Sequence, residues 1–107
     1  ASDVTLEIWA ACVPLLARAR EMAAMGFIPA GAYRNRDFFG PRVEVGPDVP
    51  LDLADVLFDP QTSGGLLVAM PEEEAEGYVP RLRELGQPAA VIGRAVARGE
   101  RSVYVTM

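Results

Sequence analysis

Short apolar runs alternate with amphipathic stretches along this chain, and that order constrains its fold more than any other feature. Apolar and polar residues alternate over residues 4–8, which predicts a first strand. An apolar stripe through residues 14–25 predicts a helix, with Pro14 in its first turn and Gly26 just after its end. Residues 27–40 carry few regular signals, so we expect an irregular segment there.

The second half of the chain continues the alternation. We expect, in order, a strand at 42–45, a short helix at 51–58, a dense turn at 59–65, a buried strand at 66–70, a helix at 71–85 kinked or broken at Pro80, and strands at 89–97 and 102–106 joined by a hairpin loop at 98–101. This order predicts an α+β fold: a two-layer sandwich with a mixed or antiparallel sheet and helices on one face, ferredoxin-like in plan.

Length and residue usage limit the chemistry. The 107 residues fit one domain spanning 1–107. All ten basic residues are arginines, and the chain has no lysine and no histidine. This excludes a lysine Schiff base, a histidine general base and an imidazole zinc site within the chain. The single Cys12 excludes an intrachain disulfide, and its apolar neighbours predict a buried, unreactive thiol.

Charge and hydropathy limit the classes of partner that the chain can bind. The net charge is −5 and the arginines are scattered, which argues against nucleic acid. No apolar run approaches the length that spans a bilayer, and no basic segment opens a signal peptide. We therefore expect a soluble, cytoplasmic chain without a membrane partner. Its abrupt, strand-like start at Val4 is what a domain cut from a longer protein would show.

The loop Asp59–Gly65 (Asp-Pro-Gln-Thr-Ser-Gly-Gly) is the sharper of two candidate sites. Pro60 should hold Asp59 extended, so that its carboxylate accepts hydrogen bonds from following amides in an Asx turn. Gly64 and Gly65 permit positive φ, which we expect at this turn, and they let a ligand or another backbone approach without a Cβ in the way. Loop hydroxyls and exposed amides could form a small anion-receiving concavity. The glycines lead into a strand and not a helix, so the dipole that favours phosphate is missing. On residue content alone, a structural turn is favoured over a site.

The second candidate site is the segment 29–36, where Arg34 and Asn35 could meet a carboxylate or a phosphate. A solvated loop is the favoured interpretation on residue content. Residues 72–74, three glutamates, fit a charged first helical turn better than a metal site. The residues alone thus indicate a soluble α/β domain with one Gly-rich loop, and no reaction.

The string Asp-Pro-Gln-Thr-Ser-Gly-Gly-Leu-Leu at 59–67 resembles the signature of the C-terminal domain in the selenophosphate synthetase (selenide, water dikinase) family of the aminoimidazole-ribotide-synthetase superfamily. Residues 29–35 resemble that family's Pro-Gly-Gly-Thr-x-Arg-Asn loop, with Ala30 where a glycine is usual, and residues 90–96 with Gly99 resemble its closing strands. The resemblance implies an enzyme that converts ATP, selenide and water to selenophosphate, AMP and orthophosphate, and that requires Mg²⁺.

The resemblance also implies what this chain lacks. In that family the N-terminal ATP-binding domain carries the reactive cysteine or selenocysteine, the metal-binding aspartates and the dimer interface, so Cys12 matches no catalytic position. We expect this domain to be inactive alone, to bind no cofactor itself, to pack against its own N-terminal domain and to work in a full-length homodimer. No catalytic or metal-binding residue is assigned. The residues expected at the cleft edge, as support or acceptor contacts, are Arg34, Asn35, Asp59, Gln61, Thr62, Ser63, Gly64 and Gly65.

Two alternatives stay open at this point. One is a free-standing ferredoxin-like module that binds a small ligand or regulates a partner. The other is the equivalent domain of a different enzyme in the same superfamily, acting on another acceptor.

Overall fold

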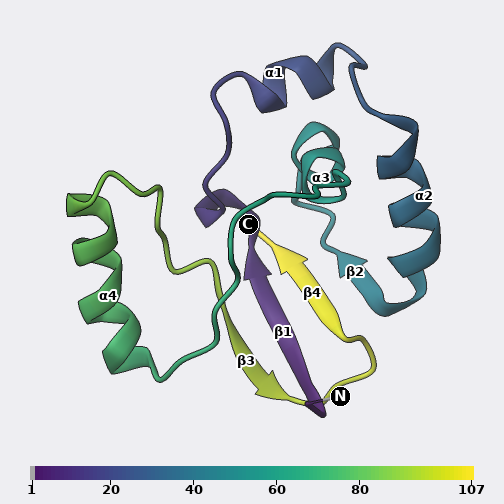
Figure 1. Cartoon of the computed structure of the whole chain (residues 1–107). Helices are drawn as coiled ribbons and strands as arrows, with labels where there is room; N and C mark the ends of the chain where they lie inside the picture. The colour runs from purple at the N-terminus through teal and green to yellow at the C-terminus, as the bar shows by residue number, and fades with distance from the viewer. Residues whose placement is uncertain (1) are drawn as a thin grey trace.

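Four strands form one mixed sheet in the order β2-β4-β1-β3 (Figure 1). The computed structural model describes residues 2–107. The strands are β1 (Val4–Trp9), β2 (Val43–Val45), β3 (Gly93–Ala97) and β4 (Val103–Thr106). β4 runs parallel to both β1 and β2, whereas β3 pairs with β1 in the antiparallel sense. The α+β class and the mixed sheet are as the sequence predicted.

The expected hairpin between the last two strands is wrong, because β1 lies between β3 and β4. The buried hydroxyl of Thr5 holds the connection across the end of β1. It donates to the carbonyl of Arg101 at 2.8 Å and accepts from the amide of Gly99 at 2.8 Å. A polar group in the sheet interior needs such partners, and here the crossing connection supplies both.

The helices are α1 (Ala19–Ala24), α2 (Ala30–Phe39), α3 (Leu51–Leu57) and α4 (Glu72–Glu84). Short 3₁₀ turns occupy Ala10–Cys12 and Gly40–Arg42. In Figure 1, α1, α2 and α3 gather at one end of the sheet while α4 stands apart beyond β3. Among residues 2–107, no helix has the length and apolar character needed to span a membrane.

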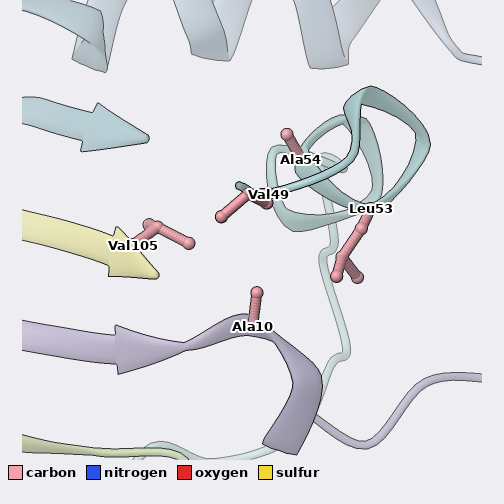
Figure 2. Close-up of a cluster of buried hydrophobic side chains, with 5 residues drawn as sticks. All are labelled: Ala10, Val49, Leu53, Ala54 and Val105. Carbon is pink, nitrogen blue, oxygen red and sulfur yellow. The ribbon is translucent and has the colours of Figure 1, made fainter. Parts of the chain in front are cut away.

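The core lies between α3 and one face of the sheet. Figure 2 shows its cluster of buried side chains between α3, the end of β4 and the turn after β1: Ala10, Val49, Leu53, Ala54 and Val105. The opposite face of the sheet is polar. There Glu7 lies opposite Arg94 and Tyr104 in the register, and Arg94 Nε is 2.6 Å from the Glu7 carboxylate. The period-two alternation of the strands therefore separates an apolar from a polar face.

The first predicted helix is shorter than expected. It begins at Ala19 and not at Pro14, because Arg18 adopts a left-handed conformation with φ of 67° and interrupts the helical path. Its end is as predicted. Gly26 has φ of +87°, and the amide of Phe27 reaches back to the carbonyl of Met22 at 3.0 Å. Cys12 is exposed, so the predicted buried thiol is wrong; the 3₁₀ turn after β1 leaves this residue at the surface.

The irregular segment expected at 27–40 is wrong, since α2 fills most of it. The helix follows Pro29, a residue that favours helix starts. Its inward side is built from Gly31, Ala32 and Asn35, which are small or polar and leave no apolar stripe in the sequence.

The predicted buried strand at 66–70 is also wrong. This segment is extended but unpaired, and Leu66 is 94% exposed. The predicted long helix is confirmed as α4, which runs through Pro80 without a break and ends before Gly86 with φ of +79°. The buried apolar stripe expected on this helix is wrong, because α4 has no buried residue.

Candidate functional site

The two candidate stretches lie against each other in the fold. The side-chain amide of Asn35, on α2, donates to the carbonyl of Phe58 at 2.9 Å, directly before the loop at 59–65. One turn earlier, a Cβ built on Gly31 would lie 2.7 Å from Cγ of Pro60. Only glycine lets the helix approach the proline ring so closely. The structure thus joins segments that are more than twenty residues apart.

A buried ion pair strengthens the same contact. Asp55 of α3 is only 7% exposed, and its carboxylate pairs with Nη2 of Arg36 on α2. The Arg36 guanidinium also lies over the Phe58 ring, 5.5 Å from its centroid. An apolar groove of about 400 Å³ opens beside this pair, between α2, β2 and α3. Arg36 is the last residue of the candidate segment 29–36, but the sequence assigned it no role, and Asp55 and Phe58 lie outside both candidate stretches.

A second ion pair also involves α3, but it links this helix to α1. Arg20 of α1 forms two hydrogen bonds with Asp52 of α3, from Nε at 2.8 Å and from Nη2 at 3.2 Å. The hydrogen bond from Arg20 lowers the pKa of Asp52 below its ordinary value and raises the pKa of Arg20. This pair joins α1 to α3, whereas Arg36 and Asp55 join α2 to α3.

Arg34 is placed differently from both pairs. It is exposed on α2, and it makes no salt bridge with any residue of the part of the chain that the structure describes. Its neighbour Asn35 faces the loop junction. The helix α2 therefore exposes one cation to solvent and is joined through Asn35 to the start of the loop at 59–65.

The loop itself departs from the expected geometry. The carboxylate of Asp59 accepts a hydrogen bond from Nε2 of Gln61 at 3.3 Å, and within residues 2–107 no backbone amide donates to it, so the Asx turn is wrong. Positive φ at Gly64 and Gly65 is wrong as well, because among the described glycines only Gly26 and Gly86 have it. The Gln61 side chain takes the place that the amides were expected to fill.

The distal part of the loop is open to solvent. Thr62, Ser63, Gly64 and Gly65 are all exposed, and neither hydroxyl has a hydrogen-bond partner within the described chain. A Cβ on Gly64 would meet only the flexible end of Gln61, 2.6 Å from Oε1, and one on Gly65 would meet nothing within 4 Å. Uncommitted donors and acceptors beside an accessible backbone suit contact with a polar or anionic group from outside.

Nothing in the described chain favours a metal centre. Across residues 2–107, no group of three or more His, Cys, Asp or Glu side chains is placed to hold an ion. The glutamates at 72–74 lie in the first turn of α4, where they complement the helix dipole as expected. The arrangement therefore offers one exposed cation, hydroxyls and an accessible backbone for binding and orientation.

Comparison with known proteins identifies close relatives. No family model matches the chain. The chain is 44% identical over 108 residues to "Selenide, water dikinase" of Clostridioides difficile, a match that covers 100% of this chain and 30% of that protein. It is 51% identical over 96 residues to the protein of the same name from Pelobacter propionicus, covering 89% of this chain and 28% of that protein. It is 36% identical over 104 residues to that of Clostridium botulinum strain Eklund 17B, covering 97% and 30%. The chain thus spans about 30% of the length of the curated relatives it matches.

Proposed function

We propose that this chain, which belongs to the selenophosphate synthetase family and corresponds to its C-terminal domain, works as one part of a longer enzyme that makes selenophosphate. The observation that carries the proposal is the similarity of almost the whole chain to proteins named selenide, water dikinase. Because it matches only about 30% of their length, a separate N-terminal region supplies the rest of the enzyme. The reaction takes ATP, selenide and water to selenophosphate, AMP and orthophosphate.

ATP and Mg²⁺ belong to that N-terminal region in this proposal. Mg²⁺ prefers clustered carboxylate oxygens together with phosphates. Within residues 2–107 no carboxylate cluster of that kind exists, and the chain has no lysine to hold a phosphate chain as a point charge. No step through either group is therefore assigned to this domain, which we expect to be inactive alone.

The role proposed for this domain is to wall the active-site cleft on the acceptor side. Arg34 supplies an exposed cation, and the loop Asp59–Gly65 supplies hydroxyls and an open backbone. The Asn35 hydrogen bond to Phe58 keeps these two features on neighbouring elements. Such groups orient a small anion and exclude water, and proton transfer and nucleophilic attack fall to the other domain. The full-length enzyme is proposed to be a cytoplasmic homodimer.

The test is AMP formation from ATP, measured with and without selenide. We expect turnover by the full-length enzyme and none by residues 1–107 alone. The matched control is the full-length enzyme without selenide, which should form little AMP. AMP formation by this chain alone would contradict the proposal. ATP turnover by the full-length protein that does not depend on selenide would favour another acceptor within the superfamily.

A further inference from the structure

Asp55 is the one acidic side chain among the described residues that is buried in the core region, and neither candidate motif includes it. Burial of a carboxylate is unfavourable unless it is paired and hydrogen-bonded. Its partner, Arg36, comes from a different helix, so the pair fixes α2 to α3 and does not serve one helix alone. The Arg36 side chain remains one-third exposed beside the apolar groove.

Three contacts converge on the residue that precedes the loop. Arg36 lies over the Phe58 ring, Asn35 donates to the Phe58 carbonyl, and the Phe58 amide donates to the carbonyl of Asp55 at 3.2 Å. We call Arg36, Asp55 and Phe58 the clamp. Because Arg34 belongs to the same helix, rotation or sliding of α2 relative to Phe58 would change the position of Arg34 relative to the loop.

We propose that Arg36 and Asp55 are positioning residues: through the clamp they fix the place of Arg34 relative to the loop Asp59–Gly65. The planar guanidinium is suited to this task because one face can lie on the ring while its edge binds the carboxylate. Lying two residues after Arg34 on α2, Arg36 fixes the helix close to the exposed cation. The inference rests on the proposed function, since it gives this geometry a role at the acceptor side of the cleft.

The chain provides a matched control in Arg20 and Asp52. Asp52 lies three residues before Asp55 on the same helix and also pairs with an arginine, but that arginine is on α1. A general effect of lost charge on α3 would appear in Asp52→Asn as well. An effect on α2 and the loop would appear only in the clamp variants.

The experiment uses the full-length enzyme with Asp55→Asn, the double variant Arg36→Met/Asp55→Leu, and Asp52→Asn. Removing one partner of a buried pair can unfold a protein, whereas apolar replacement of both partners commonly preserves stability. The double variant therefore tests position separately from folding. Three quantities are measured: kcat/KM for selenide, KM for ATP, and hydrogen exchange of the α2 amides.

In both clamp variants, we expect kcat/KM for selenide to fall about tenfold to a hundredfold, as a displacement of about 1 Å can produce. KM for ATP should stay within about twofold, because ATP is held by the other region. Exchange of the α2 amides should rise several-fold relative to wild type. Asp52→Asn should match wild type in all three measurements.

A folded double variant with wild-type kcat/KM for selenide would overturn the proposal, as would an equal fall in Asp52→Asn or an equal rise in KM for ATP. If the wild-type enzyme does not use selenide, the proposed function fails, and the clamp is then judged on exchange alone. Faster α2 exchange in the clamp variants, and not in Asp52→Asn, would support it. Unchanged exchange would refute it.

Discussion

Gly93, the first residue of β3, is the position where one added methyl group should do most harm to the fold. A Cβ there would lie 2.0 Å from the carbonyl oxygen of Glu7 and 3.1 Å from Cα of Ile8. Both are backbone atoms of the central strand β1, so neither can move without the sheet. The adjacent hydrogen bond from the amide of Trp9 to the carbonyl of Ile92, at 2.7 Å, would lengthen with them.

The magnitude follows from these contacts. Overpacking of this kind destabilises a protein by about 1–3 kcal/mol. Loss of the neighbouring hydrogen bond adds about 1 kcal/mol. Gly93→Ala should therefore lower the free energy of unfolding by roughly 2–4 kcal/mol, a large part of the total for a small domain. At about 4–8 °C per kcal/mol, the melting temperature should fall by roughly 8–32 °C.

The matched control is the same substitution at Gly77, inside α4. No heavy atom lies within 4 Å of a Cβ built there, and alanine favours the helix interior by about 0.5–1 kcal/mol over glycine. Gly77→Ala should thus stabilise the fold. Urea unfolding followed by far-UV circular dichroism compares the midpoints of the three proteins. A Gly93→Ala midpoint equal to that of wild type, or equal losses in both variants, would refute the reasoning.

Three further predictions use the same unfolding assay. Gly31→Ala should destabilise the fold by about 1–3 kcal/mol, because its Cβ would lie 2.7 Å from Cγ of Pro60, and adding Pro60→Ala should recover most of the loss. The Arg20 hydrogen bond lowers the pKa of Asp52 in the folded state below its ordinary value of 3.8. The pair therefore stabilises the fold fully at pH values above 3.8, and this stabilisation is lost as the pH falls through the lowered pKa. Asp52→Asn should remove that acid-side loss, and salt should weaken the effect in wild type since the pair is exposed. Gly65→Ala should leave the unfolding midpoint unchanged and lower the turnover of the full-length enzyme. Unchanged turnover, or a fall in turnover together with a fall in the midpoint, would contradict a role for the bare backbone at Gly65 in contacting an outside group.

Local patterns predicted the elements whose signals lie within a few residues. Strand alternation located β1 and β2, and proline and glycine marked α3 and α4. The expectations that failed depend on contacts between distant residues. β1 lies between β3 and β4, and Thr5 hydrogen-bonds to the connection that crosses it, which no turn signal near residue 100 could reveal. The apolar run at Leu66 found no strand partner, although its composition is that of a strand.

For the candidate site too, the sequence predicted local features and not the contacts between distant residues. Its two motifs were visible in the sequence, but their contact was not, because it depends on how α2 packs on the end of α3. That helix was itself missed, since Gly31 and Asn35 form a packing surface without large apolar residues. Arg36 and Asp55 are nineteen residues apart in the chain, and each taken alone looks like an ordinary surface charge.

The structure removes one of the two reasons for glycine at Gly64 and Gly65. From the sequence, glycine is expected at Gly64 and Gly65 for two reasons, positive φ and the close approach of a ligand or another backbone. In the structure neither has positive φ, and the steric need for glycine lies instead at Gly31 and Gly93, where a neighbouring ring or backbone leaves no room for a Cβ. Within residues 2–107 nothing requires a bare backbone at Gly65. A bare backbone at the surface still has one physical use, which is to let a group from outside approach the peptide closely. The proposed position of the loop at the edge of a cleft, facing an acceptor or the other domain, supplies such a group.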